Sequence, residues 1–324
     1  MIDMLRRSPS PSAAAAWLLV LAGTAAAVQA PPEGVPIGSF QEQVSVSWAL
    51  VPVLVQSADG YVDDLTRDDF RLWVDDLEVP IADFESGATA PVSFVFLQDL
   101  SGSMANGGKL VESRRALAYL LSKARPEDEF ALATFAGDLL QVEVPFTREE
   151  QVLAEAMDLW EGYGTTALHD AVAWIPSIGA EGRHPKRAVV LVSDGVDNAS
   201  TVTPETARQV VRDAQLPVYV LGLGRHDAAP GEGNGDGGAT YARLLTDLAL
   251  ATGGSYYQVA PGEEVFRAAA NLLEQLRRQY VLAFPTRAGD AGYRRIRVEV
   301  TADDRFTVYH RRGYRGGPPA AGPS

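Results

Sequence analysis

The sequence predicts an α/β fold: a doubly wound, mostly parallel sheet inserted in, or flanked by, a β-sandwich built from strands at both ends of the chain. Uniformly apolar segments alternate with amphipathic helices through the middle of the chain, a pattern typical of a parallel sheet covered on both faces. Short β-prone segments precede and follow this region. Because a few strands alone bury too little surface, one shared sandwich is favoured over two small separate sheets.

The first residues have the pattern of a secretory signal peptide. Arg6 and Arg7 precede an apolar run over 13–27, in which small residues are frequent near the end. This run is short for a bilayer span of about 20 residues, which favours cleavage of a signal peptide, 1–27, over an uncleaved anchor. Residues 28–40 are rich in Pro, Gly and Ala and predict a linker. We therefore expect export to the periplasm or the extracellular space, without stable membrane insertion after cleavage.

Residues 41–89 form a β-rich segment before the helical region. The run 42–56 is apolar and β-prone, and a hairpin turn signal follows at 58–60. The segment 68–76 predicts a turn that leads into a further strand. This part of the chain should therefore contain several short strands.

Residues 90–280 should form the α/β domain, in which apolar runs predict strands and helical spacing predicts helices. Thr147 with Glu150 predicts a capping box at the second helix, and Thr203 should cap a later one. The expected strands are 92–97, 129–135, 140–145, 188–193, 218–222 and 255–259, and the expected helices are 109–125, 147–160, 166–178, 204–215, 239–252 and 263–278.

Residues 281–315 return to a β pattern, so both ends of the chain can supply strands to the sandwich. The alternation of apolar and polar residues is strict over 294–300, and β-prone runs also occupy 280–284 and 305–310. Residues 316–324 predict a disordered tail.

Composition excludes several functional classes. The 324 residues contain 42 acidic and 28 basic side chains, a net charge of −14. Nucleic-acid binding requires clustered positive charge, so that class is not expected. The chain has no cysteine, which excludes disulfides, zinc–thiolate sites and thiol nucleophiles.

Three separate segments bring hydroxyl and carboxylate groups to predicted element ends. Asp99, Ser101 and Ser103 follow the first apolar strand, Thr166 opens a helix, and Asp194 follows the strand 188–193. In an open parallel sheet, ligands bind outside the carboxyl ends of the strands, where such groups can meet. Each segment alone is also an ordinary turn or cap sequence, but their joint order predicts one site.

These oxygen donors suit a hard cation, with magnesium expected and manganese or calcium as alternatives at the same site. We expect the hydroxyls of Ser101, Ser103 and Thr166 to bind directly. Asp99 and Asp194 would accept hydrogen bonds from metal-bound waters and orient the serines. With few direct carboxylate ligands, the ion would keep much of its charge and attract an acidic group from outside.

Residues 92–280 resemble a von Willebrand factor A domain, and Asp99–Met104 resembles the metal-ion-dependent adhesion site of that family. The resemblance implies that Thr166 and Asp194 complete the metal site and that the domain binds a protein partner; Thr165 is the alternative to Thr166. The flanking segments 65–70 and 311–314 resemble exported von Willebrand A-related proteins frequent in Acidobacteria.

Two other functional classes compete with metal-dependent protein binding. A magnesium-dependent hydrolase is less favoured because the sequence has no nucleophile elbow. Lys109 falls one place late for a phosphate loop, with Leu110 where Ser or Thr belongs, and His169 is the one candidate base near the site. The second class is a structural module whose metal only braces the loops. The sequence therefore predicts an exported adhesion or scaffold module that is not an enzyme.

Overall fold

The computed structural model describes residues 46–87, 89–195, 197–213, 216–223, 237–259, 264–287, 292–303 and 305–315. The predicted signal peptide, linker and tail lie outside these ranges. None of the described helices has the length and apolar character needed to cross a membrane.

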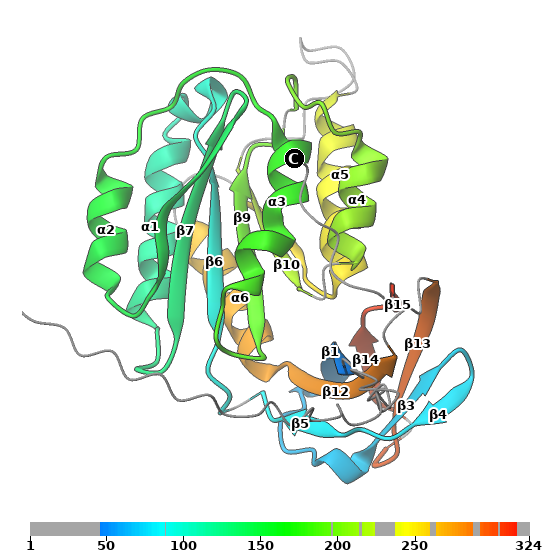
Figure 1. Ribbon diagram of the computed structural model, residues 1–324. Helices are drawn as coiled ribbons and strands as arrows, with labels where there is room; N and C mark the ends of the chain where they lie inside the picture. The colour runs from blue at the N-terminus through cyan, green and yellow to red at the C-terminus, as the bar shows by residue number, and fades with distance from the viewer. Residues whose placement is uncertain are drawn as a thin grey trace, which may run out of the picture. The chain divides into compact units, whose positions relative to one another are not determined.

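The secondary-structure elements alternate as the sequence predicts, with the α-helices confined to the middle of the chain (Figure 1). In chain order they are β1 (Val46–Ser57), β2 (Gly60–Tyr61), the 3₁₀ helix η1 (Arg67–Asp69), β3 (Phe70–Val74), β4 (Leu77–Val79), β5 (Asp83–Glu85), β6 (Ser93–Asp99), the 3₁₀ helix η2 (Gly102–Ala105), α1 (Lys109–Ser122), β7 (Glu129–Ala136), β8 (Leu139–Thr147), α2 (Glu150–Asp158), α3 (Leu168–Ala180), β9 (Arg187–Ser193), α4 (Pro204–Asp213), β10 (Val218–Leu223), α5 (Gly237–Thr252), β11 (Tyr256–Val259), α6 (Glu264–Arg278), β12 (Tyr280–Arg287), β13 (Tyr293–Val300), β14 (Thr307–His310) and β15 (Gly313–Arg315).

The central sheet has six strands in the order β11-β10-β9-β6-β7-β8. All neighbours are parallel except β7 and β8, which are antiparallel. Gly137 and Asp138 alone join those two strands, and Gly137 has φ +60°. Because a parallel connection needs a crossover of a dozen or more residues, so short a turn permits only an antiparallel edge. The predicted doubly wound, mostly parallel sheet is confirmed.

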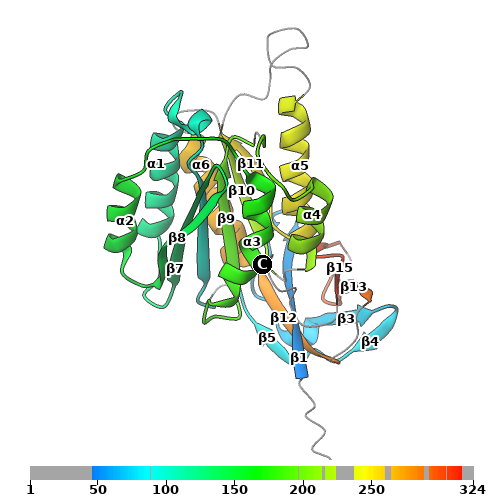
Figure 2. The ribbon, with the colours of Figure 1, turned by 45° about the horizontal axis from the view of Figure 1, so that its top comes forward.

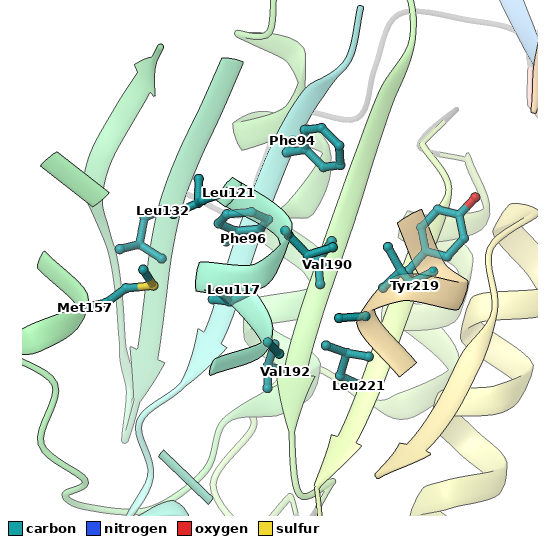
Figure 3. Close-up of a cluster of buried hydrophobic side chains, with 14 of the residues drawn as sticks. Phe94, Phe96, Leu117, Leu121, Leu132, Met157, Val190, Val192, Tyr219 and Leu221 are labelled. Carbon is teal, nitrogen blue, oxygen red and sulfur yellow. The ribbon is translucent and has the colours of Figure 1, made fainter. Parts of the chain in front are cut away.

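Alternate side chains of each strand pack on opposite faces of this sheet. Phe94 and Phe96 belong to a core shared with α1, α2 and α6, whereas Val95 and Leu97 belong to a core shared with α3, α4 and α5. Figures 1 and 2 show α1 and α2 on one side of the sheet and α3, α4 and α5 on the other. Figure 3 shows part of the first core, where Leu117 of α1 lies near Phe96. Both faces are covered, which explains why the strand sequences are apolar without alternation.

The two ends of the chain form one sandwich. The first sheet has the order β14-β1-β12-β5, with β2 paired to β1, and the second has the order β15-β13-β3-β4. A shared core contains Val51 of β1, Leu72 of β3, Leu282 of β12 and Val298 of β13. Since β1 pairs with both β12 and β14, the alternative of two separate sheets is wrong.

Two helix starts differ from the sequence prediction. Thr147 is the last residue of β8 and pairs with Phe130, so its hydroxyl does not cap a helix and the predicted capping box is wrong. Its Oγ1 accepts a hydrogen bond from Glu149 N at 3.1 Å, and α2 begins only at Glu150. Thr203 does cap α4, because its Oγ1 accepts from Thr206 N at 3.2 Å. Strand pairing overrides the local capping signal at the first position.

A buried carboxylate joins both ends of the α/β domain. Asp128, whose side chain is fully buried, forms an ion pair with Arg277 in the last turn of α6. Its Oδ1 also accepts a hydrogen bond from Val92 N at 2.9 Å, and its Oδ2 accepts one from Arg125 N at 2.8 Å. The segment that enters β6 is thereby tied to the end of α6.

Lys186 ties together the two chain segments that connect the α/β domain to the sandwich. Its ammonium donates to Gln279 O at 2.7 Å, just before β12, and to Gly87 O at 3.3 Å, between β5 and β6. Burial lowers the pKa of Lys186 to about 7, and the positive charges of Arg277 and Arg125 add to this shift. The lysine is therefore held where its charged form is disfavoured.

Stability should rise with pH because of Lys186. Its folded pKa lies below its ordinary value of 10.5, so between these two values the unfolded chain binds more protons than the folded one, and unfolding becomes harder as pH rises. Replacing Lys186 with Met removes this dependence. From pH 7 to pH 9 we expect the free energy of unfolding of the native chain to gain about 2 kcal/mol relative to Lys186→Met.

Urea unfolding of both proteins at several pH values measures this gain. Lys123→Met, which removes an exposed lysine at the end of α1, should keep the pH dependence of the native chain. Parallel curves for the native chain and Lys186→Met would contradict the prediction.

Candidate metal centre

The candidate site lies at the carboxyl ends of two neighbouring strands of the central sheet. Asp99 is the last residue of β6, and Ser101 and Ser103 lie at the cap and in the first turn of η2, which follows it. Asp194 comes directly after β9, the strand that pairs with β6 in parallel. The sequence prediction that these groups share one edge of the sheet is thus met by the strand order.

Asp99 connects the two strand ends. It is fully buried; its Oδ1 accepts a hydrogen bond from Ser101 N at 2.8 Å, and its Oδ2 accepts one from Ser193 Oγ at 2.6 Å. Burial raises the pKa of Asp99 to about 6, and the charge of Asp194 adds to this, although the bonds from Ser193 and Ser101 oppose it. Both carboxylate oxygens are therefore held by protein donors, so Asp99 orients the serine loop.

The two serine hydroxyls lie side by side. Ser101 Oγ is 3.0 Å from Ser103 Oγ, and either can be the donor. Ser101 is buried, while Ser103 is partly exposed. The pair presents two neutral oxygens with free lone pairs at one place, which is what a hard cation requires of hydroxyl ligands.

The loop before α3 packs tightly against the serine loop. Gly102 N donates to Gly164 O at 3.1 Å. A side chain at Gly162 would come within 2.8 Å of Ala105 Cβ, and Gly164 has φ +66°. Glycine is needed at both positions, one for close approach and one for a left-handed turn, which explains the glycines that precede the predicted threonine.

Thr166 is tied to the segment that follows β9. It is buried, and its amide donates to Asn198 Oδ1 at 2.8 Å. Its carbonyl accepts bonds from the amides of Asn198 and Ala199 at 3.0 and 3.1 Å. Thr165 is exposed, and its carbonyl accepts a bond from Gly137 N at 2.6 Å. Burial thus distinguishes the two threonines, and α3 begins only at Leu168.

Asp194 meets a cation that the sequence analysis did not place in the site. Its Oδ2 is 2.7 Å from Lys109 Nζ, and that ammonium also donates to Ser103 O at 3.2 Å. Its Oδ1 is buried without a hydrogen-bond partner among the described residues. The spacing from Gly102 to Lys109 is close to that of a phosphate loop, and nothing in it indicates that the lysine turns back toward the end of β9.

The residues present fit a magnesium-type ion through hydroxyls and water rather than through carboxylates. No group of three or more acidic or histidine side chains forms a metal-binding cluster in the described part of the chain. The site instead offers the paired hydroxyls of Ser101 and Ser103 and two aspartates, and the unpartnered Oδ1 of Asp194 is a buried acceptor that a metal-bound water could satisfy. Magnesium keeps several waters and accepts such a donor set.

His169 forms a buried pair with Asp197 at the start of α3. Its Nδ1 lies 3.2 Å from Asp197 Oδ2, and its backbone amide donates to the same oxygen at 3.0 Å. Burial lowers the pKa of His169, although the charges of Asp197 and Asp170 oppose this. Asp197 also accepts from Ser200 Oγ at 2.5 Å. The pair thereby secures the first turn of α3, a role for Asp197 that sequence patterns did not reveal.

Gln98, which interrupts the apolar run of β6, is also accommodated inside the protein. It is fully buried, and its Nε2 donates to Asp99 O at 2.6 Å. The polar side chain thus fixes the backbone next to the site at the cost of a buried Oε1 that has no partner among the described residues.

A hollow of about 440 Å³ begins next to the threonine. Ala167, the residue after Thr166, forms part of its wall, and Trp174 and Leu139 are its exposed apolar residues. Asp138 and Asp170 also line it. The surface beside the site is therefore mainly apolar.

Comparison with known proteins finds similarity in the α/β part of the chain. The family model for the von Willebrand factor type A domain matches residues 94–196. Human inter-alpha-trypsin inhibitor heavy chain H4 is 30% identical over an alignment of 154 residues, and the match covers 43% of this chain and 16% of that protein. The chain therefore spans only a small part of this relative's length.

Two solved structures are similar to this chain at low sequence identity. The von Willebrand factor type A protein from Catenulispora acidiphila has 13% identity and a TM-score of 0.46, covering 86% of this chain and 75% of its own. The conserved hypothetical protein BatB from Bacteroides thetaiotaomicron has 19% identity and a TM-score of 0.47, covering 57% and 98%. Both TM-scores lie below 0.5, so the identification rests on the family match.

Domains of this family are commonly adhesion or protein-interaction modules, and they often bind a divalent metal. The match over 94–196 includes Asp99 and Asp194. Residues 94–196 of this chain thus match the von Willebrand factor type A domain family.

Proposed function

We propose that this chain is an exported, metal-dependent protein-binding module. Asp99, Ser101, Ser103, Thr166 and Asp194 hold a magnesium ion, or manganese or calcium in its place, and an open coordination position captures an acidic group of a partner protein. Export is proposed from the signal-peptide pattern of residues 1–27. The relation of the flanking segments to acidobacterial proteins stays a prediction.

The observation that carries the proposal is the buried, unpartnered Oδ1 of Asp194 beside the paired hydroxyls of Ser101 and Ser103. An unsatisfied buried carboxylate oxygen is costly, and a hydrated cation would satisfy it. Asp99 uses both of its oxygens on protein donors, so few carboxylates would neutralise the ion. A cation with much of its charge left favours a carboxylate as its last ligand.

The apolar surface beside the site supports a protein rather than a small anion as the ligand. A partner that reached the ion near Thr166 would also cover the hollow lined by Trp174 and Leu139. Burial of that surface would add affinity that a free carboxylate lacks.

Metal binding and the open position can be tested together with manganese. We expect the native chain to bind Mn²⁺ in calorimetric titration, and we expect glutarate to displace a metal-bound water and lower the enhancement of water-proton relaxation. Ser101→Ala combined with Ser103→Ala should weaken Mn²⁺ binding at least ~10-fold, because two oxygen ligands are lost.

Ser122→Ala, at the exposed end of α1, is the matched control and should bind Mn²⁺ like the native chain. Unchanged affinity in the double variant would remove the serines from the site. Tight Mn²⁺ binding without any response to glutarate would favour the module whose metal only braces the loops. Capture of protein from a cell-envelope extract should then be compared in magnesium and in EDTA, and equal capture would contradict the adhesion function.

A further inference from the structure

Lys109 is placed at the candidate site by the turn that starts α1. Gly107 and Gly108 both have left-handed backbones, with φ +66° and +73°, and Lys109 is the first residue of the helix. Its side chain turns back toward the carboxyl end of β9, where its ammonium binds both Asp194 Oδ2 and Ser103 O. Helix capping does not explain the contact between Lys109 and Asp194, because Asp194 and Ser103 both lie outside α1.

The ammonium and the proposed ion require the same negative charge. The Asp194 side chain is 5% exposed and that of Lys109 is 24% exposed, so water screens their interaction less than it would at an open surface. Asp194 also faces the buried carboxylate of Asp99, whose pKa the Asp194 charge helps to raise. Lys109 relieves this crowding of acidic groups, which is also what a divalent cation would do.

We propose that Lys109 is a built-in competitor of the metal, an internal cation that neutralises Asp194 and lowers the affinity of the site for divalent ions. This inference rests on the proposed metal site and assigns its regulation. A divalent ion whose bound water contacts the Asp194 carboxylate would repel the Lys109 ammonium, which binds the same carboxylate. A module of this kind takes up its ion only where divalent cations are abundant.

Removing the charge should therefore strengthen metal binding. We expect Lys109→Met to bind Mn²⁺ and Mg²⁺ at least ~10-fold more tightly than the native chain in calorimetric titration, from the Coulomb repulsion between a single and a double charge about 5 Å apart in a water-like medium. Lys109→Arg keeps the charge and should keep the weaker affinity. Lys123→Met makes the same change in net charge at the far end of α1 and should shift the affinity less than ~2-fold.

The outcomes separate this inference from the proposed function. Metal binding by the native chain with equal or weaker binding by Lys109→Met would overturn the competitor role, because the lysine would then be neutral toward the ion or would orient Asp194 for it. No metal binding by either protein would instead overturn the metal site itself. Circular dichroism and thermal unfolding of Lys109→Met show whether the variant is folded, and Lys109→Arg repeats the comparison with the charge retained.

Discussion

Asp99→Asn should lower the affinity for Mg²⁺ and Mn²⁺ by about 100-fold, the upper end of the effect of losing a group that orients metal ligands. Asn can still accept the bond from Ser101 N, so the loop keeps its shape. What it loses is a negative charge that lies beside Asp194 and helps to attract a cation. Calorimetric titration of both proteins measures the loss.

The same substitution should stabilise the protein when EDTA is present. The folded pKa of Asp99 is about 6, above its ordinary value of 3.8, so the folded chain binds more protons than the unfolded chain between these values. Stability therefore falls as pH rises through that window and stays reduced above it. A neutral Asn avoids this cost, and we expect Asp99→Asn to gain about 1–3 kcal/mol at pH 8 and less at pH 5.

Urea unfolding in EDTA at both pH values tests the gain, with Asp158→Asn on the exposed side of α2 as the matched control. A less stable Asp99→Asn at pH 8 would show that the bonds from Ser193 and Ser101 outweigh the burial of charge. Unchanged metal affinity would separate Asp99 from the metal site.

Asp128→Ala should cost about 3–5 kcal/mol of unfolding free energy, the effect of removing one member of a buried ion pair. Burial alone would raise the pKa of Asp128, but the hydrogen bonds and charge of Arg277 and the amides of Arg125 and Val92 outweigh it, so the pKa is lowered. The substitution leaves Arg277 close to two other cations, Lys186 and Arg125, and removes the acceptor of two backbone amides.

Chemical unfolding measures this loss, and a second variant keeps the test useful if Asp128→Ala does not fold. Asp128→Asn retains an acceptor and should lose less than Asp128→Ala. Glu205→Ala breaks an exposed pair with Arg208 and should change stability by less than about 0.5 kcal/mol. A loss for Asp128→Ala as small as that control would mean that Arg277 finds water or another acceptor.

The order of strands and helices could be predicted because core strands and helices leave clear periodic patterns. The positions 94–97 are apolar without interruption, and both neighbours of β6 are buried on both faces. Local sequence patterns gave a wrong helix start where pairing between strands determines the structure. Thr147 with Glu150 has a capping pattern, but pairing with Phe130 extends β8 through the threonine.

Part of the site could be predicted because its residues carry metal-binding oxygen atoms and follow the ends of strands. Asp99 and Asp194 follow adjacent strands, and a parallel sheet must bring such ends together. Lys109 could not be placed, because its contact with Asp194 depends on the path of two glycines rather than on a pattern of side chains. Asp197 and Asn198 were missed for the same reason, since each acts on the backbone of a distant segment.

The pairing of β1 has a consequence for synthesis on the ribosome. Val46 pairs with Arg287, and Val53 pairs with both Tyr280 and His310. Strand β1 therefore cannot pair until β12 and β14 have been synthesised. At 5–20 residues per second, its apolar face stays without partners for on the order of 10–50 s. The α/β domain, whose contacts are closer in sequence, can fold during this interval and bring the two ends together. A nascent chain that stalls before β12 would thus expose the apolar, aggregation-prone strand β1 beside a folded α/β domain.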